Sequence, residues 1–143
     1  MSNGRLLVCA TPIGNLGDIS DRLRDALSSA DIIYAEDTRR TGKLLRHLVI
    51  SVPIVSLFTG NEQARTAQLL EAVKAGETVA LVTDAGMPAV SDPGAAAVRA
   101  VRDAGHPVSV IPGPSAVTTA LALSGFGGGR FVFEGFLPRK GSE

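Results

Sequence analysis

Apolar residues recur along the chain in two alternating patterns. Short continuous apolar runs are typical of strands buried on both faces of a sheet. Helical spacing, as in Leu23, Ala26, Leu27 and Ala30, is typical of a helix with one buried side. We predict strands at residues 6–10, 31–35, 52–56, 79–82, 107–111 and 131–134. Helices are expected over 23–30, 39–48, 62–75, 114–123 and from residue 93 to the glycine at 105.

Strand and helix alternate about five times, which predicts an α/β fold with a mostly parallel five-stranded sheet and helices on both faces. Pro53 interrupts the third strand and places it near an edge of the sheet. Asp18 or Ser20 is expected to cap the first helix. A Gly-rich turn precedes the short last strand. We expect residues 1–134 to form one α/β domain and residues 135–143 to begin a linker.

The composition argues against several classes of protein. Lys plus Arg and Asp plus Glu both number 14, so the chain as a whole lacks the charge of a nucleic-acid-binding protein. No apolar run reaches the roughly 18 residues that a membrane helix needs. The first residues do not resemble a signal peptide, and the single Cys9 excludes an intrachain disulfide. We therefore expect a cytoplasmic protein that does not associate with membranes.

The stretch 79–94 has the clearest functional pattern. An apolar strand runs into a long Gly- and Pro-rich loop that holds two carboxylates, Asp84 and Asp92. In open α/β sheets, ligands bind outside the carboxyl ends of strands, where this loop lies. Asp92 before Pro93 also fits an N-cap followed by proline at the first helical position, and Asp84 fits either a turn or a site. The backbone of Gly86 and Met87 is expected to contact a ligand.

Other common sites do not fit the sequence. Glu36 and Asp37 follow the second strand at the spacing of a ribose-binding acid, but the loop after the first strand has Pro12 where a dinucleotide-binding loop needs glycine. Ser115 lacks the second glycine of a nucleophile elbow. The two histidines, His47 and His106, have no neighbouring ligand pair, so no metal site is expected.

Positive charge gathers on one predicted helix. A solvated helix face explains this pattern, and so does contact with the phosphates of a nucleic acid, because phosphate binding depends on the local field. The position of the helix, after a strand end that bears acidic residues, favours the second interpretation. The basic residues are Arg39, Arg40, Lys43, Arg46 and His47.

Five stretches together resemble the tetrapyrrole methylase superfamily, the class III S-adenosylmethionine-dependent methyltransferases. Within it they are most similar to the branch that methylates a cytidine ribose of bacterial small-subunit ribosomal RNA. The stretches occur in order along the whole chain: ATPIGNLGDI (10–19), AEDTR (35–39), DAGMPAVSDPG (84–94), IPGPSA (111–116) and FEGFLPRK (133–140).

The resemblance implies that the chain is the N-terminal α/β half of a two-domain enzyme. S-adenosylmethionine would then lie between the two halves. One departure is Met87, where tetrapyrrole enzymes carry Asp, so contact there would be through the backbone. The positions that match the family's cofactor loops are Pro12, Ile13, Gly86, Met87, Val90, Ser115 and Ala116.

The resemblance further implies 2′-O-methylation of a cytidine in 16S ribosomal RNA, with a homodimer as the expected assembly. Positioning and deprotonation of the ribose hydroxyl would dominate catalysis, with Asp37 as the favoured carboxylate and Glu36 and Asp84 as the others. Arg39, Arg40 and Lys43 would contact the RNA. Two alternatives remain open: a methylase for a tetrapyrrole or another small acceptor, and a non-catalytic dimerisation or binding module.

Overall fold

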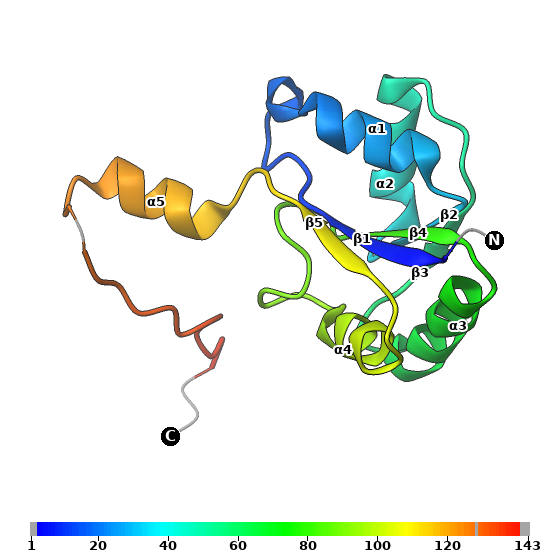
Figure 1. Cartoon of the computed structure of the whole chain (residues 1–143). Helices are drawn as coiled ribbons and strands as arrows, with labels where there is room; N and C mark the ends of the chain where they lie inside the picture. The colour runs from blue at the N-terminus through cyan, green and yellow to red at the C-terminus, as the bar shows by residue number, and fades with distance from the viewer. Residues whose placement is uncertain (1–2, 128, 141–143) are drawn as a thin grey trace.

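The computed structural model describes residues 3–127 and 129–140 (Figure 1). Strands and helices alternate through most of the described chain, as the apolar pattern predicts. The strands are β1 (Arg5–Cys9), β2 (Ile32–Ala35), β3 (Ile54–Ser56), β4 (Thr78–Val82) and β5 (Val108–Ile111). The helices are the 3₁₀ turn η1 (Leu16–Asp18), α1 (Asp21–Ser29), α2 (Thr38–Leu48), α3 (Glu62–Lys74), α4 (Ala95–Asp103) and α5 (Ala116–Ser124).

The five strands form one sheet in the order β3-β2-β4-β1-β5, and every neighbouring pair is parallel. This confirms the predicted α/β fold and its five-stranded sheet. The strand β3 begins directly after Pro53 and lies at one edge of the sheet as predicted. β1 lies between β4 and β5, with Val8 in register with Leu81 on one side and Val110 on the other. The ends of these three strands therefore meet at one place.

Helices cover both faces of the sheet, α1 and α2 on one face and α3 and α4 on the other (Figure 1). Alternate residues of the strands face α1 and α2 on one side, where Leu7, Leu27 and Leu45 are buried. The others face α3 and α4, where Leu6, Leu69 and other apolar side chains are buried. Burying a side chain of this size contributes roughly 1.5–3 kcal/mol, so packing on both faces stabilises the central strands. The loops at the carboxyl edge stand on this base.

Helix starts agree with the sequence in one case and differ in another. Ser20 caps α1, and its hydroxyl accepts a hydrogen bond from the Leu23 N–H at 3.0 Å. The prediction that Asp92 caps a helix beginning at Pro93 is wrong, because α4 begins at Ala95 with Gly94 as its N-cap. The Gly94 N–H donates to the Glu62 carboxylate at 3.1 Å, so a side chain from α3 holds the start of α4.

The predicted strand at 131–134 is also wrong, since the described residues after α5 form no strand. A strand needs a neighbour that accepts its backbone hydrogen bonds, and this segment follows α5 away from the sheet (Figure 1). We call residues 125–127 and 129–140 the C-terminal arm. Apolar side chains on α5 and the arm are exposed, among them Leu123, Phe126 and Phe136 at 87%, 89% and 84%. Within the described residues, no helix has the length and apolarity to cross a membrane.

Candidate functional site

The site is built where the loops after β1, β4 and β5 meet. The N–H and C=O of Gly86 pair with those of Thr11 at 3.0 and 3.1 Å, so an isolated antiparallel bridge joins the first two loops. The Ala10 N–H donates to Ile111 C=O at 3.1 Å. A Cβ on Gly113 would lie 3.1 Å from the Cβ of Ala10, closer than most side chains allow. The third loop therefore packs directly on the first.

The loop between β4 and α4 has an unusual backbone. Gly86 and Gly94 adopt positive φ angles of 79° and 124°, which glycine tolerates. Ala89 and Ser91 also have positive φ angles, 66° and 54°, although each carries a Cβ. Such residues cost of order 1–3 kcal/mol each and concentrate at ligand-binding sites. The surrounding fold thus holds this loop in a shape that it would not adopt alone.

A cavity of about 630 Å³ opens between these loops, α5 and the C-terminal arm. Its size lies within the range of small-molecule sites, and its wall is mainly apolar with a few polar groups, as such sites are. The residues that line it are Ile13, Glu36, Asp84, Ala85, Gly86, Met87, Val90, Ser91, Asp92, Ser115, Ala116, Val117, Phe133, Gly135 and Phe136.

Six of the seven residues that match the family's cofactor loops line the cavity: Ile13, Gly86, Met87, Val90, Ser115 and Ala116. Pro12 adjoins them in the chain but is not part of the wall. Both backbone groups of Gly86 are already bonded to Thr11. Gly86 can therefore shape the wall, whereas it has no free backbone N–H to offer a ligand. A Cβ at its position would lie 3.5 Å from the Ile13 side chain.

The three carboxylates singled out from the sequence occupy different environments. Glu36 and Asp84 line the cavity, whereas Asp37 does not. Asp37 caps α2 by accepting from the Arg39 N–H at 2.9 Å, and it pairs with Arg39 Nε at 3.6 Å. The backbone N–H of Arg39 holds the pKa of Asp37 below its usual value. Asp84 in turn accepts from the Asp37 N–H at 3.1 Å, so Asp84 fixes the turn between β2 and α2.

Glu36 has the opposite shift. Burial raises the pKa of its carboxyl, and the charges of Asp84 and Asp92 raise it further. Arg40 acts against this rise, which means that the basic helix α2 borders the carboxylates. A carboxyl whose pKa is raised toward the working pH is better suited to accept a proton.

The three residues expected to contact RNA, Arg39, Arg40 and Lys43, are exposed on α2. None of them lines the cavity. They lie on the helix that starts directly after Glu36 and Asp37, so their positive charge is beside the cavity rather than inside it. A polyanion that reaches the cavity from this side would meet these residues first.

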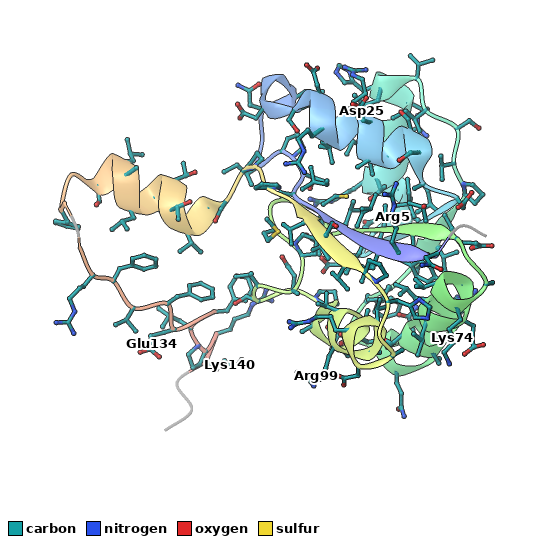
Figure 2. The ribbon with its side chains drawn as sticks, viewed as in Figure 1. Arg5, Asp25, Lys74, Arg99, Glu134 and Lys140 are labelled. Atoms are coloured by element: carbon teal, nitrogen blue, oxygen red, sulfur yellow. The ribbon has the colours of Figure 1, made fainter. Side chains whose placement is uncertain are left out.

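Several residues of the wall were not named as site residues from the sequence, although all but Val117 lie in stretches that resemble the family. Phe133, Gly135 and Phe136 of the wall come from the C-terminal arm. Figure 2 shows this segment after α5, with Glu134 and Lys140 labelled. The signal for these three residues was the stretch 133–140, which resembles the family. Asp92 was missed because the Asp-Pro pair is also a helix-start pattern. The others are Ala85, Ser91 and Val117.

No group of three His, Cys, Asp or Glu side chains comes together closely enough to hold a metal ion anywhere in residues 3–127 and 129–140.

Comparison with known proteins places these loops in a wider group. The family model described as tetrapyrrole (corrin/porphyrin) methylases matches residues 5–137. The ribosomal RNA small subunit methyltransferase I of Mycobacterium tuberculosis is 53% identical over 144 residues, 99% of this chain and 50% of that protein. The protein of the same name from Thermotoga maritima is 48% identical over 136 residues, 95% of this chain and 61% of that protein. The chain thus spans about half the length of most of the curated relatives compared here.

Solved structures share the fold at lower identity. Uroporphyrin-III-C-methyltransferase from Thermus thermophilus has a TM-score of 0.65 and 24% identity, covering 84% of this chain and 51% of that one. A diphthine synthase has a TM-score of 0.62 and 21% identity, covering 85% and 48%. These similarities extend to the fold alone.

Proposed function

The chain belongs to the tetrapyrrole (corrin/porphyrin) methylase family, and on this premise we propose that it forms the N-terminal half of an enzyme that methylates small-subunit ribosomal RNA. The membership confirms the resemblance drawn from the five loops. The observation that carries the proposal is the identity of about half of all residues to proteins named ribosomal RNA small subunit methyltransferase I, over 95–99% of the chain. The reaction we propose is 2′-O-methylation of a cytidine.

Methylases of this kind take their methyl group from S-adenosylmethionine in general, and the cavity fits that donor. Its volume suits a molecule of this size. Ile13, Met87 and Val90 offer an apolar wall, and Ser115 at the start of α5 offers a hydroxyl. We propose that these residues, with Gly86 and Ala116, hold the donor. When bound, it supplies an electrophilic methyl group.

The residues of this chain then position the ribose hydroxyl and take up its proton. Among the three candidate carboxylates, Glu36 is the best placed for the second task, because it faces the cavity and its pKa is raised. Asp84 supports it by fixing the turn that carries both Glu36 and Asp37. The environment of Asp37, with a lowered pKa and two contacts to Arg39, favours a structural role over proton transfer.

The basic side of α2 supports an RNA substrate. Arg39, Arg40 and Lys43 are exposed, and the charge of Arg40 acts on Glu36 of the acidic wall. Phosphate contacts of this kind position a nucleic acid without reading its sequence. A tetrapyrrole acceptor has no comparable observation in its favour, since the porphyrin methylase structures share the fold alone.

The exposed apolar surface of α5 and the arm supports the proposed domain arrangement. We propose that residues 1–134 form the N-terminal domain and that residues 135–143 begin the linker to a second domain. Exposed side chains such as Phe126, Phe136 and Leu137 are unusual for a monomeric surface and favour contact with that domain or with a second copy in a homodimer. A non-catalytic binding module would use the same surface, and the experiment below separates the two.

The proposal is tested by methyl transfer from tritiated S-adenosylmethionine to small ribosomal subunits that lack the modification. The full-length M. tuberculosis relative serves as the reference for this chain. We expect the chain alone to bind the donor weakly by calorimetry and to transfer little, and the full-length protein that carries it to label 16S RNA on a cytidine ribose. Labelling of a tetrapyrrole acceptor in place of RNA, or no donor binding by the full-length protein, would contradict the proposal.

A further inference from the structure

The charged side chains in the cavity wall are all carboxylates. Glu36 comes from the end of β2, Asp84 from the end of β4, and Asp92 from the segment before α4. Three separate elements thus direct carboxylates to one cavity, and no lysine, arginine or histidine is among its lining residues. The rest of the wall is apolar or small.

The charges of these carboxylates act on one another. The charges of Asp84 and Asp92 add to the effect of burial in raising the pKa of Glu36, and the charge of Asp84 does the same for Asp92. Within residues 3–127 and 129–140, the ion pairs are Arg39–Asp37 and Lys74–Glu71. None of the three cavity carboxylates therefore forms an ion pair with a basic side chain. A backbone hydrogen bond from Asp84 and the charge of Arg40 act against the rise in the pKa of Glu36.

A buried hydroxyl lies next to this group. Thr83 precedes Asp84 and is 2% exposed. Its side chain is close enough to Asp92 to lower the pKa of that carboxyl by hydrogen bonding. Three carboxylates from separate elements around one mainly apolar cavity match an organic cation as the ligand.

We propose that Glu36, Asp84 and Asp92 make the cavity selective for the positively charged sulfonium donor over the neutral thioether that remains after transfer. This inference rests on the proposed function and adds a specificity determinant to it. In the transfer, the sulfur–methyl bond breaks with its electron pair staying on sulfur, a methyl–oxygen bond forms, and the hydroxyl proton leaves to a base. The ligand loses its charge in this step. The acidic wall therefore holds the substrate more strongly than the product and favours release after each turnover.

The test is the ratio of two affinities. S-adenosylmethionine and S-adenosylhomocysteine are titrated by calorimetry at pH 8, where carboxyls are ionised, into the full-length protein and its variants Glu36→Gln and Asp92→Asn. Each substitution keeps the shape and removes one negative charge. The matched control is Asp25→Asn, an exposed carboxylate on α1 (Figure 2). It changes the net charge equally but lies outside the cavity wall.

We expect the unmodified protein to bind the sulfonium more tightly than the thioether. Each cavity variant should lower that preference by about fivefold or more, as Coulomb attraction over a few ångströms in a partly hydrated site implies. The affinity for the thioether should change little or rise, and Asp25→Asn should change neither affinity.

Different outcomes would contradict the charge selection and the proposed function. If both ligands bind and their affinity ratio is the same in all four proteins, charge selection is refuted while the proposed function stands. If the unmodified full-length protein binds neither ligand, the proposed function fails and this inference fails with it. If both variants lose both ligands equally, the carboxylates shape the cavity and do not select charge.

Discussion

Replacing Gly94 by alanine tests whether the start of α4 and the cavity loop are fixed by tight packing. Gly94 has a φ of 124°, where a residue with a Cβ is strained by about 1–3 kcal/mol. A Cβ there would also lie 2.8 Å from Cδ2 of Leu81, a core side chain that is almost fully buried. Overpacking of this kind costs about 1–3 kcal/mol. We therefore expect Gly94→Ala to lower the free energy of unfolding by about 2–6 kcal/mol in total.

Gly105 provides a matched control at the other end of α4. It too has a positive φ, 81°, but a Cβ there meets nothing within 4 Å. Gly105→Ala should thus cost only the backbone strain, about 1–2 kcal/mol. The change in the entropy of the unfolded chain is the same for both substitutions and cancels in the comparison.

The assay is urea unfolding followed by circular dichroism. With an m value of about 2 kcal/mol/M, a difference of about 2 kcal/mol separates the two midpoints by about 1 M. Removing the obstacle should recover part of the loss, so the cost of Gly94→Ala combined with Leu81→Ala should be less than the sum of the two single costs. Equal midpoints for the two glycine variants, or strict additivity in the double variant, would refute the packing argument.

Three further outcomes are expected. Val49→Asn should raise the free energy of unfolding by about 0.5–1 kcal/mol, since Val49 is 91% exposed and β-branched at a φ of 57°; thermal unfolding measures this, and an unchanged or lower midpoint would contradict it. Cys9, fully buried with a pKa raised to about 12 by burial, should react with a thiol reagent at pH 8 only in urea; rapid labelling of the native protein would show that the core opens. Glu36→Gln should stabilise the protein above the folded pKa of Glu36, because a carboxyl with a raised folded pKa weakens folding once it ionises; the gain should vanish below the unfolded pKa, and a gain independent of pH would exclude the charge as its cause.

The sheet was predictable because its signal is local and strong. Short apolar runs before and after each of the first four helices favour a parallel sheet, because that layer arrangement buries them. Even the edge position of β3 followed from Pro53. The start of α4 did not follow, because the local Asp92-Pro93 signal was overridden by two tertiary contacts, of Gly94 with Leu81 and with Glu62.

The strand predicted at 131–134 is absent for a related reason. Its alternation of phenylalanine and other residues has strand propensity, but propensity alone does not form a strand without a neighbouring strand. Described residues of the arm instead contribute Phe133 and Phe136 to the cavity wall. The composition of this segment favours a strand, but it does not reveal whether a neighbouring strand is there to pair with it.

The position of the site was predictable, whereas the roles of its acids were not. Loops after parallel strands gather at one edge, and six of the seven positions matched to the family line one cavity. Glu36 and Asp37 are adjacent in the chain, and no pattern separates them. The structure separates them because the strand ends at Ala35 and the helix begins at Thr38. One carboxylate of the turn then faces the cavity and the other caps the helix.

The charge of Glu36 has opposite effects on folding and on the proposed function: it lowers stability and would favour binding of the donor. Its ionised carboxylate is held beside Asp84 and Asp92, which weakens folding, and the same charge is what would attract a sulfonium. Glu36→Gln should therefore raise the unfolding midpoint at neutral pH and, in the same protein, lower the preference for donor over product. A purely structural carboxylate would move only the first quantity, and a side chain that merely fills the cavity would move neither with pH. Measuring both on one variant distinguishes an acid kept for its charge from one kept for its shape.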